Sequence, residues 1–250
     1  MPEANSVLTR RSFGQTKRKD FWWVQPLVVF IGLSTFLVYA TWAALQGKYY
    51  EWGPYLSPMY SPLLFGESHH SWFGLQPKWL PLWITPAILI LWAPGGFRVT
   101  CYYYRGAYYK AFWGDPPSCT VGEPRKYYRG ENSFPLILQN IHRFFLYLAL
   151  IFILILSYDF WKALWFPNPQ TGQTEFGVGV GTIVLLLNVV LLAGYTFGCH
   201  SLRHLIGGGT DEISKKPLCK FAYDNVSKFN RRHMTWAWCS LIWVMFSDLY

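Results

Sequence analysis

Long apolar stretches alternate with polar connections along the chain. Five of these stretches approach or exceed the roughly 20 residues that a helix needs to cross a bilayer. They cover residues 22–45, 80–103, 135–161, 177–200 and 234–249. The last is short, and its tryptophans suit a membrane interface or a helix packed on a partner. The pattern predicts an all-α membrane protein, a bundle of five transmembrane helices that forms a single transmembrane domain over residues 1–250.

The composition supports a membrane bundle and argues against other classes. Hydrophobic residues make up 52% of the 250 residues and charged residues 14%, against roughly 25% charged residues in a soluble domain. This excludes a disordered chain, a collagen and a small disulfide-rich protein, and it argues against a soluble enzyme. The first twenty residues are polar and basic, and no small-residue cleavage site follows the first apolar stretch, so no signal peptide is expected.

The positive charges are distributed unevenly among the polar connections. The net charge of +9 alone would be compatible with nucleic-acid binding. Of the 22 Lys and Arg residues, however, only Lys48, Lys78 and Lys162 lie after the first and third stretches, and the other 19 lie on the opposite side. The positive-inside rule therefore places the N-terminus in the cytoplasm and the C-terminus outside. This explains the charge without nucleic acid, and no nucleic-acid partner is expected.

The outer connection, residues 48–79, is long and rich in Pro, Ser and aromatic residues. We expect it to fold over the outer mouth of the bundle. It contains the adjacent pair His69 and His70. Such a pair sometimes binds a metal, but a solvated surface pair is the favoured interpretation here.

Most cysteines and histidines are expected to gather at the cytoplasmic face, near the ends of four predicted helices. This set comprises Cys101, Cys119, His142, Cys199, His200, His204, Cys219 and His233. His200 and His204 are four residues apart and therefore share one helical face. Imidazole suits iron, zinc or copper, and thiolate suits zinc or iron–sulfur clusters. A metal centre is one interpretation of this layer; interfacial polar residues bonded to carbonyls or to a partner subunit are the other.

Basic and aromatic residues alternate between Arg98 and Lys110, at the cytoplasmic end of the second stretch. Such a run usually anchors a helix at the interface. The hydroxyl of Tyr104 and the guanidinium groups of Arg105 and Arg143 are also suitable donors to the carbonyl oxygens of a quinone. Ionisable residues at this depth are functional candidates. We therefore predict Tyr104, Arg105 and Arg143 as quinone-binding residues.

Common enzyme motifs are missing from the sequence. It contains no phosphate loop, no dinucleotide-binding glycine pattern, no HExxH and no nucleophile elbow. No catalytic residue is predicted, and no independent enzymatic activity is expected. The apolar stretches carry no charge at mid-depth, which disfavours a transporter or a channel.

Four segments near the predicted helix ends carry a family resemblance. They are residues 97–113 (FRVTCYYYRGAYYKAFW), 115–119 (DPPSC), 135–143 (PLILQNIHR) and 199–204 (CHSLRH). They resemble the cytochrome b-like membrane-anchor subunit of succinate dehydrogenase, complex II, and more narrowly the five-helix single-chain anchor of the mycobacterial-type complex (Sdh1). The resemblance covers residues 22–249. It implies a multi-pass protein of the inner (plasma) membrane that docks an iron–sulfur subunit and, through it, a flavoprotein, and that passes electrons to a membrane quinone.

The narrower resemblance also implies a Rieske-type [2Fe–2S] cluster, which takes two thiolates and two imidazoles. The expected ligands are Cys101, Cys119, His200 and His204. The reserve ligands are His142, His233 and Cys199.

Haem b is a less favoured cofactor. Anchors with two haems need four axial histidines, two of them toward the outer side, and no predicted transmembrane stretch has a histidine in its outer half. Two interpretations remain as alternatives to the cluster: a single haem near the cytoplasmic face, or a structural anchor that binds quinone without a redox centre of its own.

Overall fold

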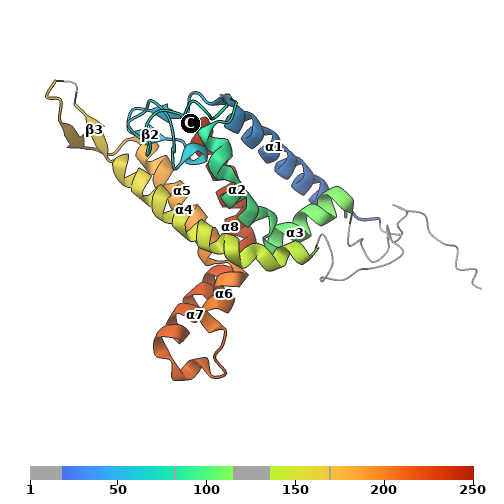
Figure 1. Ribbon diagram of the computed structural model, residues 1–250. Coiled ribbons are helices and arrows are strands. Elements are labelled where there is room, and N and C mark those ends of the chain that lie inside the picture. Colours follow the sequence, from blue (N-terminus) through green and yellow to red (C-terminus); the bar gives the residue numbers. More distant parts are fainter. Residues whose placement is uncertain (1–18, 82, 115–135, 169) are drawn as a thin grey trace, which may run out of the picture.

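The structure is a computed structural model that describes residues 19–81, 83–114, 136–168 and 170–250. Figure 1 shows a bundle of long helices with a layer of loops at one end and a helical hairpin that projects from the other end. The hairpin consists of α6 (His200–Gly207) and α7 (Pro217–Asn230). The bundle helices are α1 (Val24–Gln46), α2 (Pro86–Val99), α4 (His142–Lys162), α5 (Val180–Phe197) and α8 (His233–Leu249).

Exposed apolar side chains cover much of the surface of the long helices. In the described part of the chain, three helices are long and apolar enough to cross a membrane, namely Val24–Gln46, Gln139–Lys162 and Val180–Phe197, and α2 is apolar but shorter. On α1, Leu37 is 64% exposed and Val38 is 70% exposed. Contiguous apolar exposure of this kind is rare on soluble proteins. The fold is that of a mostly helical membrane protein with three to four apolar helices.

Short elements connect the bundle helices. α3 (Tyr102–Tyr108) continues into a π-helical turn, η2 (Tyr109–Trp113), and η3 (Leu136–Ile141) leads into α4. The others are β1 (Glu51–Trp52), β2 (Tyr55–Leu56), η1 (Pro58–Tyr60), β3 (Trp165–Pro167), β4 (Thr174–Phe176) and η4 (Ile213–Lys215). β1 pairs antiparallel with β2, with Glu51 opposite Leu56, and β3 pairs antiparallel with β4. Both hairpins lie at the end of the bundle that carries the layer of loops (Figure 1).

The connection between α1 and α2 folds over one end of the bundle, which we call the loop end. The hydroxyl of Tyr60 donates to a carbonyl of α1 at 2.7 Å. The buried carboxylate of Asp159 on α4 accepts a hydrogen bond from Ser61. Asp248 on α8 accepts one from Ser57. The loop layer is thus fastened to three bundle helices, α1, α4 and α8, by hydrogen bonds between polar side chains and backbone or carboxylate oxygens.

The predicted stretch 80–103 is not one continuous helix. α2 begins at Pro86, where the preceding Thr85 hydroxyl accepts a backbone N–H of the first turn at 3.4 Å. A capping hydroxyl followed by proline is a strong helix start. At the other end, the hydroxyl and the N–H of Thr100 bond to the carbonyl of Gly96 at 2.7 and 3.0 Å. This side-chain bond competes with helix continuation, and the chain breaks before α3.

Two clusters of buried, mostly apolar residues lie within the described part of the chain. One lies beneath the loop layer and includes Met59, Tyr60 and Leu63. The other lies at the opposite end, where α2, α4, α5 and α8 meet, and includes Phe97 and Tyr195. The second cluster also contains two cysteines, so we call this the Cys/His end.

The neighbouring glycines of α2 give a matched test of helix packing. A methyl group at Gly96 would overlap the ring of Phe145 on α4, whereas at Gly95 it would meet none of the described atoms within 4 Å. We expect Gly96→Ala to destabilise the protein by about 1–3 kcal/mol, the usual effect of overpacking. Gly95→Ala should be neutral or slightly stabilising, because alanine favours helix by about 1 kcal/mol over glycine. Thermal unfolding in detergent measures both; equal shifts would contradict the close approach of α2 to α4.

Candidate metal centre

Two helix breaks position two cysteines at the Cys/His end. α2 breaks at Cys101 before α3, and α5 breaks at Cys199 before α6. The backbone angles are nearly the same, φ −63° and ψ 134° at Cys101 and φ −68° and ψ 138° at Cys199. In each case the cysteine N–H donates at 3.2 Å to the carbonyl three residues earlier, Arg98 or Thr196. Both side chains are 1% exposed, so each break buries a thiol.

Two histidines complete the group from the first residues of two other helices. His142 begins α4 and His233 begins α8. The Nε2 atom of His142 lies 3.0 Å from Sγ of Cys199, and Nε2 of His233 lies 3.4 Å from Sγ of Cys101. Cys101 and Cys199 belong to the same cluster of buried residues. These four side chains, the Cys/His centre, therefore come from four helix ends that converge in space (Figure 1).

Aromatic rings and a hydroxyl hold the imidazoles in place. Phe97 stacks on His142 with ring centres 4.6 Å apart, and Tyr195 stacks on His233 at 5.0 Å. The Nδ1 atom of His142 lies 2.9 Å from the hydroxyl of Thr100. Nδ1 of His233 is buried and has no hydrogen-bond partner among the described residues. A buried nitrogen without a partner is costly, and metal ligation would satisfy it.

A half-buried arginine lies beside the centre. Arg98 donates to the hydroxyl of Tyr104 at 2.9 Å, to the hydroxyl of Ser240 at 3.0 Å and to the carbonyl of Ala237 at 3.3 Å. Its guanidinium also lies 4.7 Å from the ring centre of Tyr195. These contacts fix a positive charge beside Tyr195, whose ring stacks on His233.

An apolar cavity of about 410 Å³ extends toward the centre from the membrane-spanning part of the bundle. At the loop end it is lined by alkyl side chains that include Leu45 and Met59. At the Cys/His end it is lined by Phe97, Arg98 and Tyr195. Because Phe97 and Tyr195 also stack on the two imidazoles, one aromatic ring separates the cavity from each histidine.

Of the three expected ligands that the structure describes, one lies in the centre. Cys101 is there, and Cys119 lies outside the described residues. His200 and His204 do share a face of α6, with their Nε2 atoms 2.9 Å apart, but that face is exposed. Partial desolvation and the positive charges of His204 and Arg203 lower the pKa of His200. The three reserve ligands occupy the remaining places of the centre: His142, His233 and Cys199.

The three predicted quinone-binding residues do not line the apolar cavity. Tyr104 is buried, and its hydroxyl donates to the carbonyl of Ala237 at 2.6 Å and accepts from Arg98. The guanidinium of Arg105 lies 4.7 Å from the ring centre of Tyr102. Arg143 is exposed and lines a separate, wider cavity of about 870 Å³.

Arg98 and Tyr195 were not among the predicted site residues, although the sequence holds a signal for both. Arg98 precedes Cys101 by three residues and Tyr195 precedes Cys199 by four, so each lies one helical turn before a break. This one-turn spacing can be recognised only when the positions of the two helix breaks are known.

The chain matches a family model described as actinobacterial succinate dehydrogenase subunit SdhC over residues 24–250. Among solved structures, it is similar to a chain of the Mycobacterium smegmatis Sdh1 complex in the apo form. That similarity has a TM-score of 0.85 and 41% sequence identity, and it covers 97% of this chain and 92% of that chain. No curated protein matches the chain.

Proposed function

The chain belongs to the actinobacterial SdhC family of succinate dehydrogenase membrane subunits, and from this premise we propose that it relays electrons to a membrane quinone through a Rieske-type [2Fe–2S] cluster. As a member of this family it is a membrane-anchor subunit of the succinate dehydrogenase complex in the plasma membrane. The redox centre, its ligands and the quinone position are the proposal.

The proposed ligands are Cys101, Cys199, His142 and His233. Two thiolates and two imidazoles are the donor set of a Rieske-type cluster. The side chains form two contacting pairs, His142 with Cys199 and His233 with Cys101. Water reaches this place poorly, because Cys101 and Cys199 are each 1% exposed and His142 is 3% exposed. When bound, such a cluster takes up and passes on one electron at a potential raised by its histidine ligands. The protein's contribution is to bury the donors and to orient the two imidazoles. Thr100 orients His142 through its hydroxyl, and the stacked rings of Phe97 and Tyr195 hold His142 and His233.

The geometry supports a haem less well. A haem with two axial histidines requires a flat macrocycle between the two imidazoles. Here each imidazole contacts a thiol, and each ring is stacked on an aromatic side chain. An anchor without any redox centre would leave two thiols and two imidazoles buried together, with Nδ1 of His233 unsatisfied.

We place the quinone ring at the Cys/His end of the apolar cavity, against Phe97, Arg98 and Tyr195. The alkyl lining suits an isoprenoid tail, and polar groups at one end of an apolar pocket are what orients a ligand. The Tyr195 hydroxyl lies beside Cys101 but has no hydrogen-bond partner of normal geometry among the described residues, so it is available as a donor. The Arg98 guanidinium would stabilise negative charge that develops on a quinone oxygen. Tyr104 serves by holding Arg98 in place.

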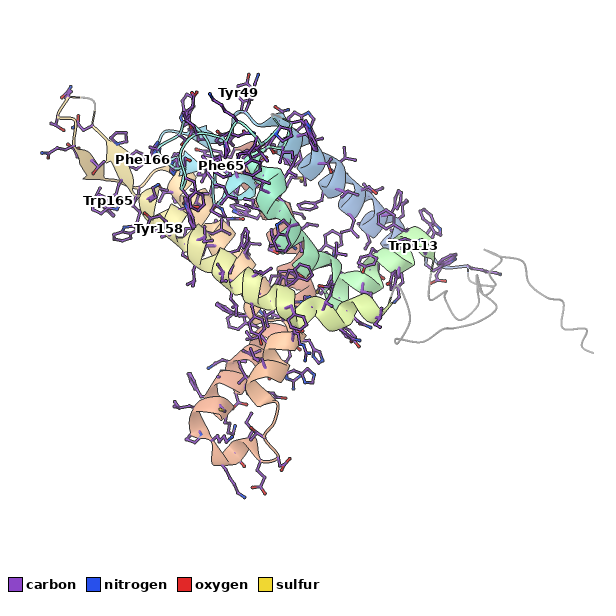
Figure 2. All side chains as sticks on the ribbon, viewed as in Figure 1. Tyr49, Phe65, Trp113, Tyr158, Trp165 and Phe166 are labelled. Carbon is purple, nitrogen blue, oxygen red and sulfur yellow. The ribbon has the colours of Figure 1, made fainter. Side chains whose placement is uncertain are left out.

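We further propose that the chain spans the membrane five times as one domain, with the Cys/His end toward the cytoplasm. The basic residues support this orientation, because Lys215, Lys216, Lys220 and Lys228 all lie on the projecting α6–α7 hairpin or its connection. Figure 2 shows aromatic side chains near both ends of the bundle, Trp113 after α3 and Tyr158, Trp165 and Phe166 near β3, as expected for two membrane interfaces.

The projecting hairpin supports a docking role for the Cys/His end. Two large apolar side chains of α7, Leu218 and Phe221, are 84% and 70% exposed. Lysines surround them, which fits a contact with the iron–sulfur subunit and, through it, with the flavoprotein. Electrons would then arrive at the same end of the bundle as the Cys/His centre.

Metal analysis of the complete complex tests the proposal. Iron and acid-labile sulfide should exceed the content of the soluble flavoprotein and iron–sulfur subunits by two of each per anchor chain, the content of one [2Fe–2S] cluster. Equal iron content with and without the anchor, measured against the same flavin content, would leave the chain as a structural anchor. Extra iron accompanied by a reduced-haem absorption band, and without extra sulfide, would favour the haem.

A further inference from the structure

A second group of potential metal ligands lies at the loop end, far from the Cys/His centre. It consists of Glu51 on β1 and the adjacent residues His69 and His70. One ligand atom from each of the three side chains lies within 4.8 Å of those of the other two. The sequence favoured a solvated surface pair for the two histidines; this is wrong for His70, which is 3% exposed.

His70 is a buried imidazole whose polar atoms are not satisfied. Neither ring nitrogen makes a hydrogen bond of normal geometry with the described residues, although the Gly53 backbone lies near enough to act on the ring. The pKa of His70 is lowered to about 4, chiefly by burial and in smaller part by its neighbours His69 and Lys162. The ring is therefore neutral near pH 7, with a lone pair on one nitrogen.

Ser68 connects the strand that carries Glu51 to the turn that carries the histidines. Its hydroxyl oxygen accepts the backbone N–H of His70 at 3.0 Å, and the hydroxyl donates to the carboxylate of Glu51. The rings of His69 and His70 have centres 4.0 Å apart, so they lie together on one side of the turn. A ligand carboxylate held by a further hydrogen bond is typical of built metal sites.

We propose that Glu51, His69 and His70 bind one divalent transition-metal ion, Zn²⁺, with a fourth position open to water. Two imidazoles and a carboxylate with an open position form a recurrent zinc site, and imidazole disfavours Mg²⁺ and Ca²⁺. Zinc–nitrogen bonds of about 2.0–2.1 Å bring tetrahedral donors to roughly 3.3 Å from one another. Because Glu51 and His69 are exposed, rotation of their side chains can close the remaining distance around the fixed His70.

The surroundings of the site are compatible with one bound cation and an open coordination position. The three ligands line a cavity of about 700 Å³ together with Tyr158, on α4, and Lys162. The Lys162 ammonium weakens cation binding, and the carboxylate of Glu51 offsets it. The cavity gives a water ligand access to the fourth position.

Zinc binding to the complete complex tests this proposal. The complex is freed of loosely bound metal, titrated with Zn²⁺ against a competing chromophoric chelator, and compared among variants. We expect one zinc ion per anchor chain in the wild type, at least tenfold weaker binding in Glu51→Gln, and loss of the site in the His69→Gln/His70→Gln double variant. Glu67→Gln removes a charge from the same loop outside the cluster and should bind zinc as the wild type does.

Two controls keep the outcome decisive. Glu51→Gln preserves the shape of the side chain, so it tests the site even where replacement of the buried His70 disturbs the loop. Co²⁺ in place of Zn²⁺ should give the visible ligand-field bands of a tetrahedral site in the wild type but not in Glu51→Gln. Wild-type zinc affinity in both Glu51→Gln and the double variant would overturn the proposal. Iron content and quinone reduction should stay unchanged throughout, which separates this site from the Cys/His centre.

Discussion

Replacing His142 with alanine is expected to stop electron transfer to quinone while succinate oxidation by a soluble dye continues. In the proposed centre the His142 imidazole is an iron ligand, and its loss leaves one iron without a donor in a buried site. Even the loss of a residue that only supports a metal ligand typically costs 10–100-fold in metal affinity or activity, so we expect a fall of about 100-fold or more. The ratio of quinone to dye reduction in the purified complex measures the effect, and His233→Ala should behave in the same way.

His200→Ala and His204→Ala are the matched controls. Both variants replace histidines at the same end of the bundle as the centre, and these histidines lie on the exposed face of α6. We expect the quinone-to-dye ratio of each to stay within about twofold of the wild type, since surface substitutions usually have small effects. Loss of quinone reduction in these two variants, with normal activity in His142→Ala, would show that the ligand set read from the sequence is the right one.

Replacing Arg98 with glutamine is expected to lower kcat/KM for quinone by about 100-fold, the usual cost of removing one donor that stabilises developing negative charge. The iron content should be unchanged, because Arg98 contacts Tyr104, Ser240 and Ala237 and none of the four proposed ligands through a hydrogen bond. Arg98→Lys keeps the charge but not the forked geometry, and we expect intermediate activity.

Arg143→Gln is the control for this prediction. Arg143 was expected from the sequence to bind quinone, but the structure places it beside the separate, wider cavity. Quinone kinetics of the two variants, measured at matched flavin content, decide between the two positions. Normal kinetics in Arg98→Gln together with a large loss in Arg143→Gln would move the quinone out of the apolar cavity.

The hydrophobic pattern predicts the long helices well, because lipid demands long apolar segments whatever the tertiary contacts. It does not reveal the breaks at Cys101 and Cys199. Both cysteines lie inside the predicted stretches, 80–103 and 177–200, and the causes of the breaks are local: the Thr100 hydroxyl bonds to a helix carbonyl, and α5 ends before Gly198. Because the breaks were not anticipated, the one-turn relation of Arg98 and Tyr195 to the two cysteines was also missed.

The candidate site shows where spacing along the chain stops being informative. The four-residue spacing of His200 and His204 predicts their common face, which the structure has, but it does not say whether that face points inward. His142 and His233 are 91 positions apart in the sequence and lack any local pattern. Their meeting depends on how α4 and α8 pack. The burial of His70 likewise could not be predicted from the sequence, because an irregular loop has no periodicity that indicates which side chains point inward.

Low-temperature EPR of the dithionite-reduced complete complex tests the central claim most directly. The account predicts a signal beyond those of the soluble iron–sulfur subunit, with the low average g-value of a [2Fe–2S] cluster that has mixed cysteine and histidine ligands. The signal should disappear in Cys199→Ser and persist in Cys219→Ser, which alters a half-buried cysteine of α7 outside the centre. No additional signal in the wild type, or a signal that survives in Cys199→Ser, would contradict the assignment of the Cys/His centre.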